Sequence, residues 1–113
     1  MLEYLGGALL SSELNIIENL TSDPINITLS GEIDIYTAPE LKEKIYKIAD
    51  SHKSDLQIDC ADLEYIDSTG LGIFVGALKK VKSYDKQIYI VNLKENIKKL
   101  FVLTGLEKLF VIK

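Results

Sequence analysis

The sequence is poor in the residue types that characterise several large classes of protein. It has no tryptophan, and all 13 of its basic residues are lysine, so arginine is absent. Nucleic-acid binding usually needs a basic face, with arginine to contact phosphates and guanines. Because the net charge is −4 and the pI is near 5.0, we do not expect the chain to bind nucleic acid directly.

Cysteine and histidine are equally scarce, with one residue of each, Cys60 and His52. A single cysteine cannot build a disulfide framework, which favours a reducing, cytoplasmic compartment. The same scarcity excludes a cysteine-based or multi-histidine metal site within one chain. Cys60 lies at an inward position of a predicted strand, where it is expected to act as a small buried hydrophobe.

Long apolar runs are also missing. No stretch approaches the ~20 residues that a membrane span needs. The opening MLEYLGGALLSS is mildly apolar, but it has no positively charged start and it contains Glu3, so no signal peptide is predicted. We expect a cytoplasmic protein without membrane contact, in which residues 1–12 form an extension of unknown role.

The rest of the chain has the composition of one folded domain. The whole chain of 113 residues is 47% hydrophobic and 27% charged, which is typical of a globular protein. We therefore predict a single domain over residues 13–113. It has no long apolar seam that demands a dimer, so a monomer is the expectation.

Hydrophobic periodicity predicts the elements of this domain. Residues 25–34 alternate between apolar and polar, as on a strand with one buried face. Strand and helix patterns then follow one another, which favours parallel crossovers. Because the strands are apolar on one side only, helices are expected mainly on one face of the sheet. The predicted strands are 14–20, 25–34, 56–63 and 87–93, the helices begin near 37, 68 and 95, and 106–112 is a short helical turn or strand.

Two of the helix starts carry the pattern of a capping box. Thr37 is followed three residues later by Glu40, and Asn92 by Glu95. In such a box the first side chain bonds a free backbone N–H and the acidic side chain reaches back. Thr37 and Asn92 are therefore predicted caps.

The most informative stretch is YIDSTGLGIFVGALKK, residues 65–80. Asp67, Ser68 and Thr69 stand just before an apolar-periodic run, as ordinary helix caps do. The start of a helix has free N–H groups and a partial positive charge, so a phosphate on Ser68 would find donors aimed at it. The local pattern leaves both interpretations open, a cap alone or a modified serine.

The helix that follows has two different faces. Its predicted core face consists of Leu71, Phe74, Val75, Leu78 and Val81. Gly72 and Gly76 lie on another face, where two interior glycines indicate that something approaches closely. Ile73 and Ala77 are expected beside them, outside the core, and we predict that Ile73 and Gly76 contact a partner.

Three segments in this order resemble one family along residues 14–112. They are GEIDIYTAPELKEKI (31–45), YIDSTGLGIFVG (65–76) and LFVLTGLEKLF (100–110). Together they resemble the anti-sigma-factor antagonists, the single-domain STAS proteins of bacterial stress and sporulation switches. The resemblance implies an α/β fold with a mixed sheet of about four to five strands and helices mainly on one face.

By that resemblance, the protein binds a serine-kinase anti-sigma factor and displaces the sigma factor that the kinase holds. The kinase uses ATP to phosphorylate the serine directly after the aspartate, here Ser68, and the phosphoprotein then releases the kinase. A PP2C-type phosphatase restores the antagonist. The chain would be a substrate and binding module, not an enzyme, without a metal or cofactor of its own.

The resemblance also implies which residues meet the partner. Asp67 orients Ser68 or engages the kinase, while Thr69 and Gly70 shape the helix start. The loop after the second strand contributes to docking. Its implied residues are Asp34, Tyr36 and Thr37, although Thr37 could serve only as a cap and Tyr36 only as a half-buried staple against the helix.

Two other functions remain as alternatives. A serine hydrolase would need a base for Ser68, and His52 is the sole histidine, placed near a helix end where a cation is simply favourable. A STAS scaffold or assembly subunit without phosphorylation would share the fold, which does not fix function.

Overall fold

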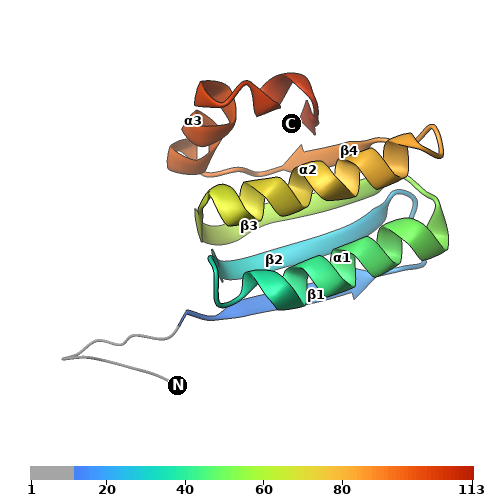
Figure 1. Cartoon of the computed structure of the whole chain (residues 1–113), viewed down its shortest axis with the longest axis horizontal. Helices are drawn as coiled ribbons and strands as arrows, with labels where there is room; N and C mark the ends of the chain where they lie inside the picture. Colours follow the sequence, from blue (N-terminus) through green and yellow to red (C-terminus); the bar gives the residue numbers. More distant parts are fainter. Residues whose placement is uncertain (1–11) are drawn as a thin grey trace.

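The computed structural model describes residues 12–113 (Figure 1). Within them, one five-stranded sheet has the order β1-β2-β3-β4-β5. β1 and β2 are antiparallel and the other neighbours are parallel, so the predicted mixed sheet is confirmed. The elements are β1 (Leu14–Asn19), β2 (Ile25–Ile33), α1 (Ala38–His52), β3 (Leu56–Ile66), α2 (Ser68–Lys82), β4 (Ile88–Val91), α3 (Glu95–Leu103), the 3-10 turn η1 (Leu106–Lys108) and β5 (Val111–Ile112).

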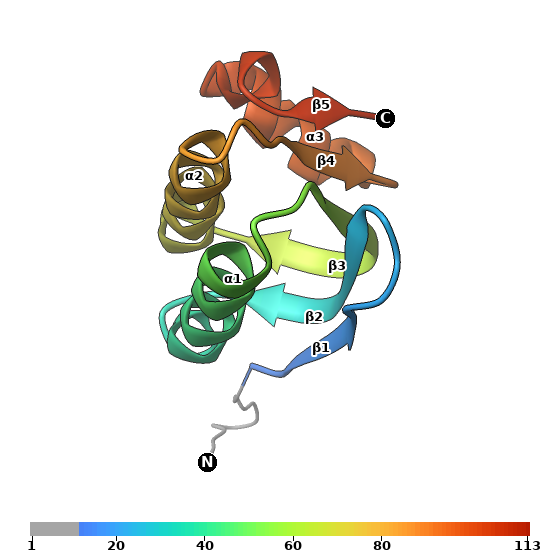
Figure 2. The ribbon, with the colours of Figure 1, turned by 90° about the vertical axis from the view of Figure 1, so that its right-hand side faces the viewer.

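Helices cover one face of the sheet and the other face is more exposed to solvent, as the alternating strands predict. Ile25, Ile27 and Leu29 of β2 are buried, whereas Asn26 and Thr28 between them are partly exposed. α1 and α2 lie on the same side of the sheet (Figure 2). No helix in the described part of the chain is long and apolar enough to cross a membrane.

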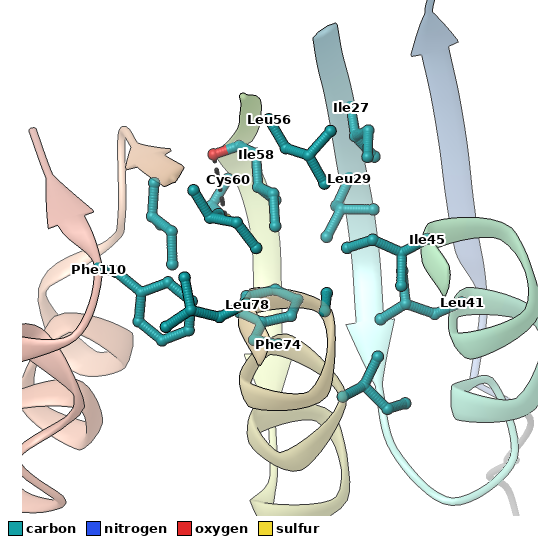
Figure 3. Packing of buried hydrophobic residues seen from close by; sticks show 14 of the residues in the cluster. Ile27, Leu29, Leu41, Ile45, Leu56, Ile58, Cys60, Phe74, Leu78 and Phe110 are labelled. Carbon is teal, nitrogen blue, oxygen red and sulfur yellow. Dashed lines mark hydrogen bonds between the residues drawn. The ribbon is translucent and has the colours of Figure 1, made fainter. Parts of the chain in front are cut away.

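A single hydrophobic core fills the space between the sheet and the helices (Figure 3). Phe74 of α2 packs on Phe101 of α3 at a ring-centroid distance of 6.3 Å, and Phe101 meets Phe110 edge-on at 5.9 Å. These rings join α2, α3 and the end of the chain. Cys60 is fully buried in this core, as predicted, and burial with the nearby charge of Asp59 raises its pKa to about 12.

Neither predicted capping box forms. Thr37 precedes α1, but its side chain makes no cap bond and instead donates to the Glu32 carbonyl at 2.8 Å. Asn92 lies in the loop between β4 and α3 and has a φ of 63°. Its side-chain amide donates to the Asp59 carboxylate at 3.0 Å. Thr37 is the N-cap residue of α1, as predicted, but its hydroxyl bonds the end of β2 instead of the helix. The Asn92 cap is wrong, because Asn92 bonds Asp59 within β3 and Lys94 stands at the N-cap of α3.

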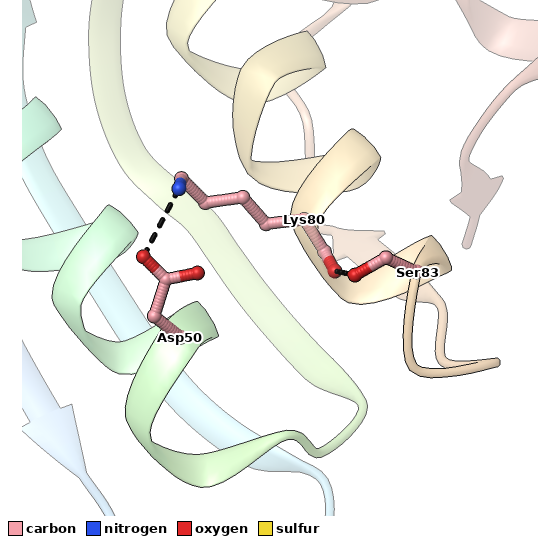
Figure 4. A network of polar contacts seen from close by, with 3 residues as sticks. All are labelled: Asp50, Lys80 and Ser83. Carbon is pink, nitrogen blue, oxygen red and sulfur yellow. Dashed lines mark hydrogen bonds and ion pairs between the residues drawn. The ribbon is translucent and has the colours of Figure 1, made fainter.

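α1 and α2 run side by side in the same direction, since each follows a parallel strand (Figure 1). Each has 15 residues and is therefore about 22 Å long. Lys80 of α2 joins them by an ion pair with Asp50 at 3.0 Å (Figure 4). The same ammonium lies 5.1 Å from the ring of Tyr46, so one lysine contacts two residues of α1.

The close approach predicted at the α2 glycines is present at Gly76 only. A Cβ on Gly76 would lie 1.8 Å from the Tyr46 hydroxyl oxygen, whereas a Cβ on Gly72 would meet nothing within 4 Å. The expectation that Ile73 and Ala77 lie outside the core is wrong, because both are buried. The α1–α2 contact covers this face of α2, which a helical projection of α2 alone could not reveal.

Candidate functional site

Ser68 is the first residue of α2 and is exposed. The cap of this helix is Asp67, whose carboxylate accepts from the N–H groups of Thr69 at 3.0 Å and Gly70 at 3.3 Å. The Asp67 N–H in turn donates to the Ile33 carbonyl at 3.3 Å, which ties the turn to the end of β2. The capping role therefore falls on Asp67, and the fold does not require the Ser68 hydroxyl for it.

This arrangement corrects the expectation that a phosphate on Ser68 would find donors ready for it. The Thr69 and Gly70 N–H groups already bond the Asp67 carboxylate. A phosphate would add roughly −1.5 to −2 charge beside that carboxylate. Two anions would then compete for the same helix end, so phosphorylation would strongly change the local electrostatics.

Gly70 fits the helix start closely onto the sheet. A Cβ there would lie 2.6 Å from a side-chain carbon of Ile33 and 2.6 Å from one of Ile66. These isoleucines end β2 and β3, the strands whose registers place Ile33 beside Ile66. Gly70 thus sets the position of the turn that carries Ser68.

The loop between β2 and α1 lies at the same end of the sheet. Asp34 organises it by accepting from the N–H groups of Tyr36 at 2.8 Å and Thr37 at 3.2 Å, and from the Ser12 hydroxyl. Thr37 is buried and its hydroxyl accepts from the Asp34 N–H at 3.0 Å. Tyr36 is 78% exposed, so the alternative role as a half-buried staple is wrong.

These bonds also act on the charge state of Asp34. Partial burial acts to raise the pKa of this carboxyl. The hydrogen bond from Ser12, followed by those from the backbone N–H groups of Tyr36 and Thr37, outweighs burial and holds the pKa below its usual value. The ionised carboxylate is therefore the form that the folded loop favours.

Asp34→Asn should consequently destabilise the protein by about 1 kcal/mol at neutral pH, because the amide is a weaker acceptor. A lowered folded pKa stabilises the fold above the unfolded value of about 3.9 and loses that effect as pH falls through the folded pKa. The gap between wild type and variant should thus shrink below pH 4. Urea unfolding at pH 7 and pH 3 measures this gap, with exposed Asp62→Asn as the control. An unchanged gap at both pH values would contradict the assignment.

A groove of about 530 Å³ opens beside Ser68, between the N-terminal halves of α1 and α2. Most residues that line the groove were not predicted from the sequence. The available signal was Ile35, an apolar residue in the predicted loop between Asp34 and Tyr36. The predicted contact residue Ile73 lines the groove, but with only 6% of its surface exposed. The lining residues are Ile35, Ala38, Pro39, Lys42, Tyr46, Thr69, Gly72 and Ile73.

His52 is not placed to activate Ser68. It belongs to the last turn of α1, whereas Ser68 begins α2. The two helices run in the same direction, so these residues lie about one helix length apart, roughly 22 Å (Figure 1). A general base must come within hydrogen-bond reach of its proton, which this geometry does not allow.

Comparison with known proteins agrees with this architecture. The family model described as the STAS domain matches residues 15–113. The anti-sigma-B factor antagonist of Staphylococcus epidermidis is 42% identical over 94 residues, which are 82% of this chain and 87% of that protein. The chain belongs to the STAS family of anti-sigma-factor antagonists. The STAS domain thus includes the Ser68 turn, the Asp34 loop and the groove.

Solved structures resemble this STAS domain along most of its length. An anti-sigma factor antagonist from Mycobacterium paratuberculosis superposes with a TM-score of 0.77 at 26% identity, covering 88% of this chain and 85% of that one. SpoIIAA of Bacillus in its phosphorylated form gives a TM-score of 0.70 at 18% identity, covering 88% and 91%. At that identity the likeness to SpoIIAA concerns the fold alone.

Proposed function

We propose that this protein is a cytoplasmic anti-sigma-factor antagonist switched by phosphorylation of Ser68. In the unphosphorylated form it binds a serine-kinase anti-sigma factor and frees the sigma factor. The kinase then phosphorylates Ser68 and dissociates, and a PP2C-type phosphatase removes the phosphate. In this account the chain is a substrate and a binding partner, and the phosphoryl chemistry belongs to the kinase.

The observation that carries the proposal is the exposed Ser68 at a helix start already capped by Asp67. A kinase can reach this hydroxyl without undoing a bond that the fold needs. The product phosphate would stand beside the Asp67 carboxylate, in the middle of the surface that a kinase must cover to reach Ser68. Such a change of charge favours release, because like charges desolvated at an interface repel each other.

The Asp34 loop and the Ser68 turn would together form the docking surface. Ile35 and Tyr36 are exposed and stand on a loop held by Asp34, and Thr37 supports the loop from inside. Asp67, Thr69 and Gly70 hold the neighbouring turn. We therefore assign Thr37 and Gly70 to positioning, and Tyr36 and Thr69 to contact with the partner.

Two substitutions at Ser68 test the switch. Ser68→Ala should bind the purified anti-sigma kinase as wild type does and keep releasing sigma factor in the presence of ATP. Ser68→Asp should bind about tenfold more weakly, because it adds one charge at the interface. Calorimetric titration measures the binding, and a matched Ser51→Asp at the far end of α1 controls for charge. Equal sigma-factor release by both Ser68 variants would contradict the switch.

The phosphorylation-independent scaffold is the second candidate. A STAS domain can present the same surface without modification, since fold alone does not fix function. If Ser68→Ala and Ser68→Asp bind every partner alike, the scaffold replaces the switch.

A further inference from the structure

The groove beside Ser68 has features of a site for a protruding side chain. Its floor contains Ile73 and Ala38, which are almost completely buried. One wall is Ile35, a large apolar side chain that is 61% exposed. Burying such a surface against a partner is favourable in proportion to the apolar area removed from water. The groove therefore fits an apolar side chain better than a polar one.

Gly72 keeps this groove open. An added Cβ at Gly72 would meet no atom within 4 Å, so neither the α1 contact nor the core requires a glycine at this helical position. An interior glycine lowers helix propensity. Any larger residue would project into the space between α2 and the Asp34 loop, because Gly72 itself lines the groove. The glycine is thus explained by the open groove.

The groove also has a charge. Among the described residues that line it, Lys42 carries the one formal charge, on a side chain that is exposed. Its ammonium lies 5.6 Å from the ring centroid of Tyr46, another wall residue, which holds the cation at the rim. A carboxylate on a partner segment bound in the groove could form an ion pair with the Lys42 ammonium.

We propose that the groove receives a segment of the anti-sigma partner that presents an apolar side chain next to a carboxylate. This inference rests on the proposed function, and it names the chemistry that the docking surface recognises. The groove is continuous with the site of phosphoryl transfer, because Thr69 lines it and directly follows Ser68. A kinase docked over the Ser68 hydroxyl would therefore lie next to the groove.

Gly72→Leu tests the apolar half of the proposal. The leucine would occupy part of the groove, and its Cβ would meet no atom within 4 Å. Binding to the purified anti-sigma kinase should weaken about tenfold or more, as when a central interface pocket is lost. Gly72→Ala adds only one methyl group and should weaken binding less than Gly72→Leu does. Circular dichroism and urea unfolding establish that both variants are folded.

Lys42→Glu tests the charged half. It should weaken binding about tenfold, because the introduced carboxylate faces the partner's own. Lys47→Glu makes the same charge change on the same helix outside the groove, and should leave binding within about twofold of wild type. In wild type, added salt should weaken binding more than it does in Lys42→Gln.

The outcomes separate this proposal from the proposed function. If the kinase neither binds nor phosphorylates the wild type, the proposed function has failed and the groove has no such partner. If the wild type is bound while Gly72→Leu and Lys42→Glu bind equally well, the groove proposal is overturned and the switch stands. A concentration-dependent dimer that Gly72→Leu abolishes would overturn it too, by assigning the groove to a second copy.

Discussion

Replacing Phe74 with alanine should lower the free energy of unfolding by about 3–5 kcal/mol. Phe74 is fully buried and packs on Phe101, which itself packs on Phe110. The substitution removes the ring and leaves a cavity where α2, α3 and the end of the chain meet. Natural domains are stable by only about 5–15 kcal/mol, so this loss would be a large share of the total.

Urea unfolding followed by circular dichroism gives the measurement. Leu103→Ala is the matched control, because Leu103 is an apolar residue of α3 that is 82% exposed. Its loss should stay within about 0.5 kcal/mol, as for surface substitutions in general. A similar small loss for Phe74→Ala would contradict the described core.

Gly70→Ala and Gly72→Ala should change stability in opposite directions, although the two glycines are only two positions apart in one helix. At Gly70 the new methyl group would overlap side-chain carbons of Ile33 and Ile66, each 2.6 Å away. Overpacking of this kind costs about 1–3 kcal/mol. At Gly72 the methyl group meets nothing, so the higher helix propensity of alanine should add about 0.5–1 kcal/mol of stability.

The same pair reports on the Ser68 turn. The shift forced by Gly70→Ala displaces an N–H that Asp67 caps, so the rate of Ser68 phosphorylation should fall in a variant that is still folded. Gly72→Ala should be phosphorylated at close to the wild-type rate. If both variants gain stability equally, the close packing of α2 on β2 and β3 is wrong.

Much of the fold could be predicted because its strands are amphipathic. The alternation in residues 25–33 identifies β2, its buried face and the one-sided cover of helices. The end of β3 was predicted three residues too early, at Leu63 instead of Ile66. The pairing of β2 with β3 shifts register between Thr28 and Ser30 and again between Gly31 and Glu32, and at each shift β3 carries an extra residue. These irregularities break the period of two within β3, on which the prediction of the strand relied.

The site was predictable where it depends on local sequence. Asp67 before a helix start is a local signal, and the structure assigns the cap to it. The groove depends instead on how α1 packs against α2, which brings Ile35, Lys42 and Tyr46 near Gly72 from distant positions. The same contact buries Ile73, which the projection of one helix had placed outside the core. Packing between α1 and α2 determines which residues line the groove and which are buried. The hydrophobic periodicity of a single helix does not encode that packing.

The most direct test of the central claim is intact-mass measurement and site mapping after incubation of the protein with source-cell lysate and Mg·ATP. The account predicts one phosphoryl group, located on Ser68 and absent from Ser68→Ala. A lysate kinase shown to be active on a control antagonist makes a negative result decisive. An unmodified protein, or a phosphate on another residue, would contradict the Ser68 switch.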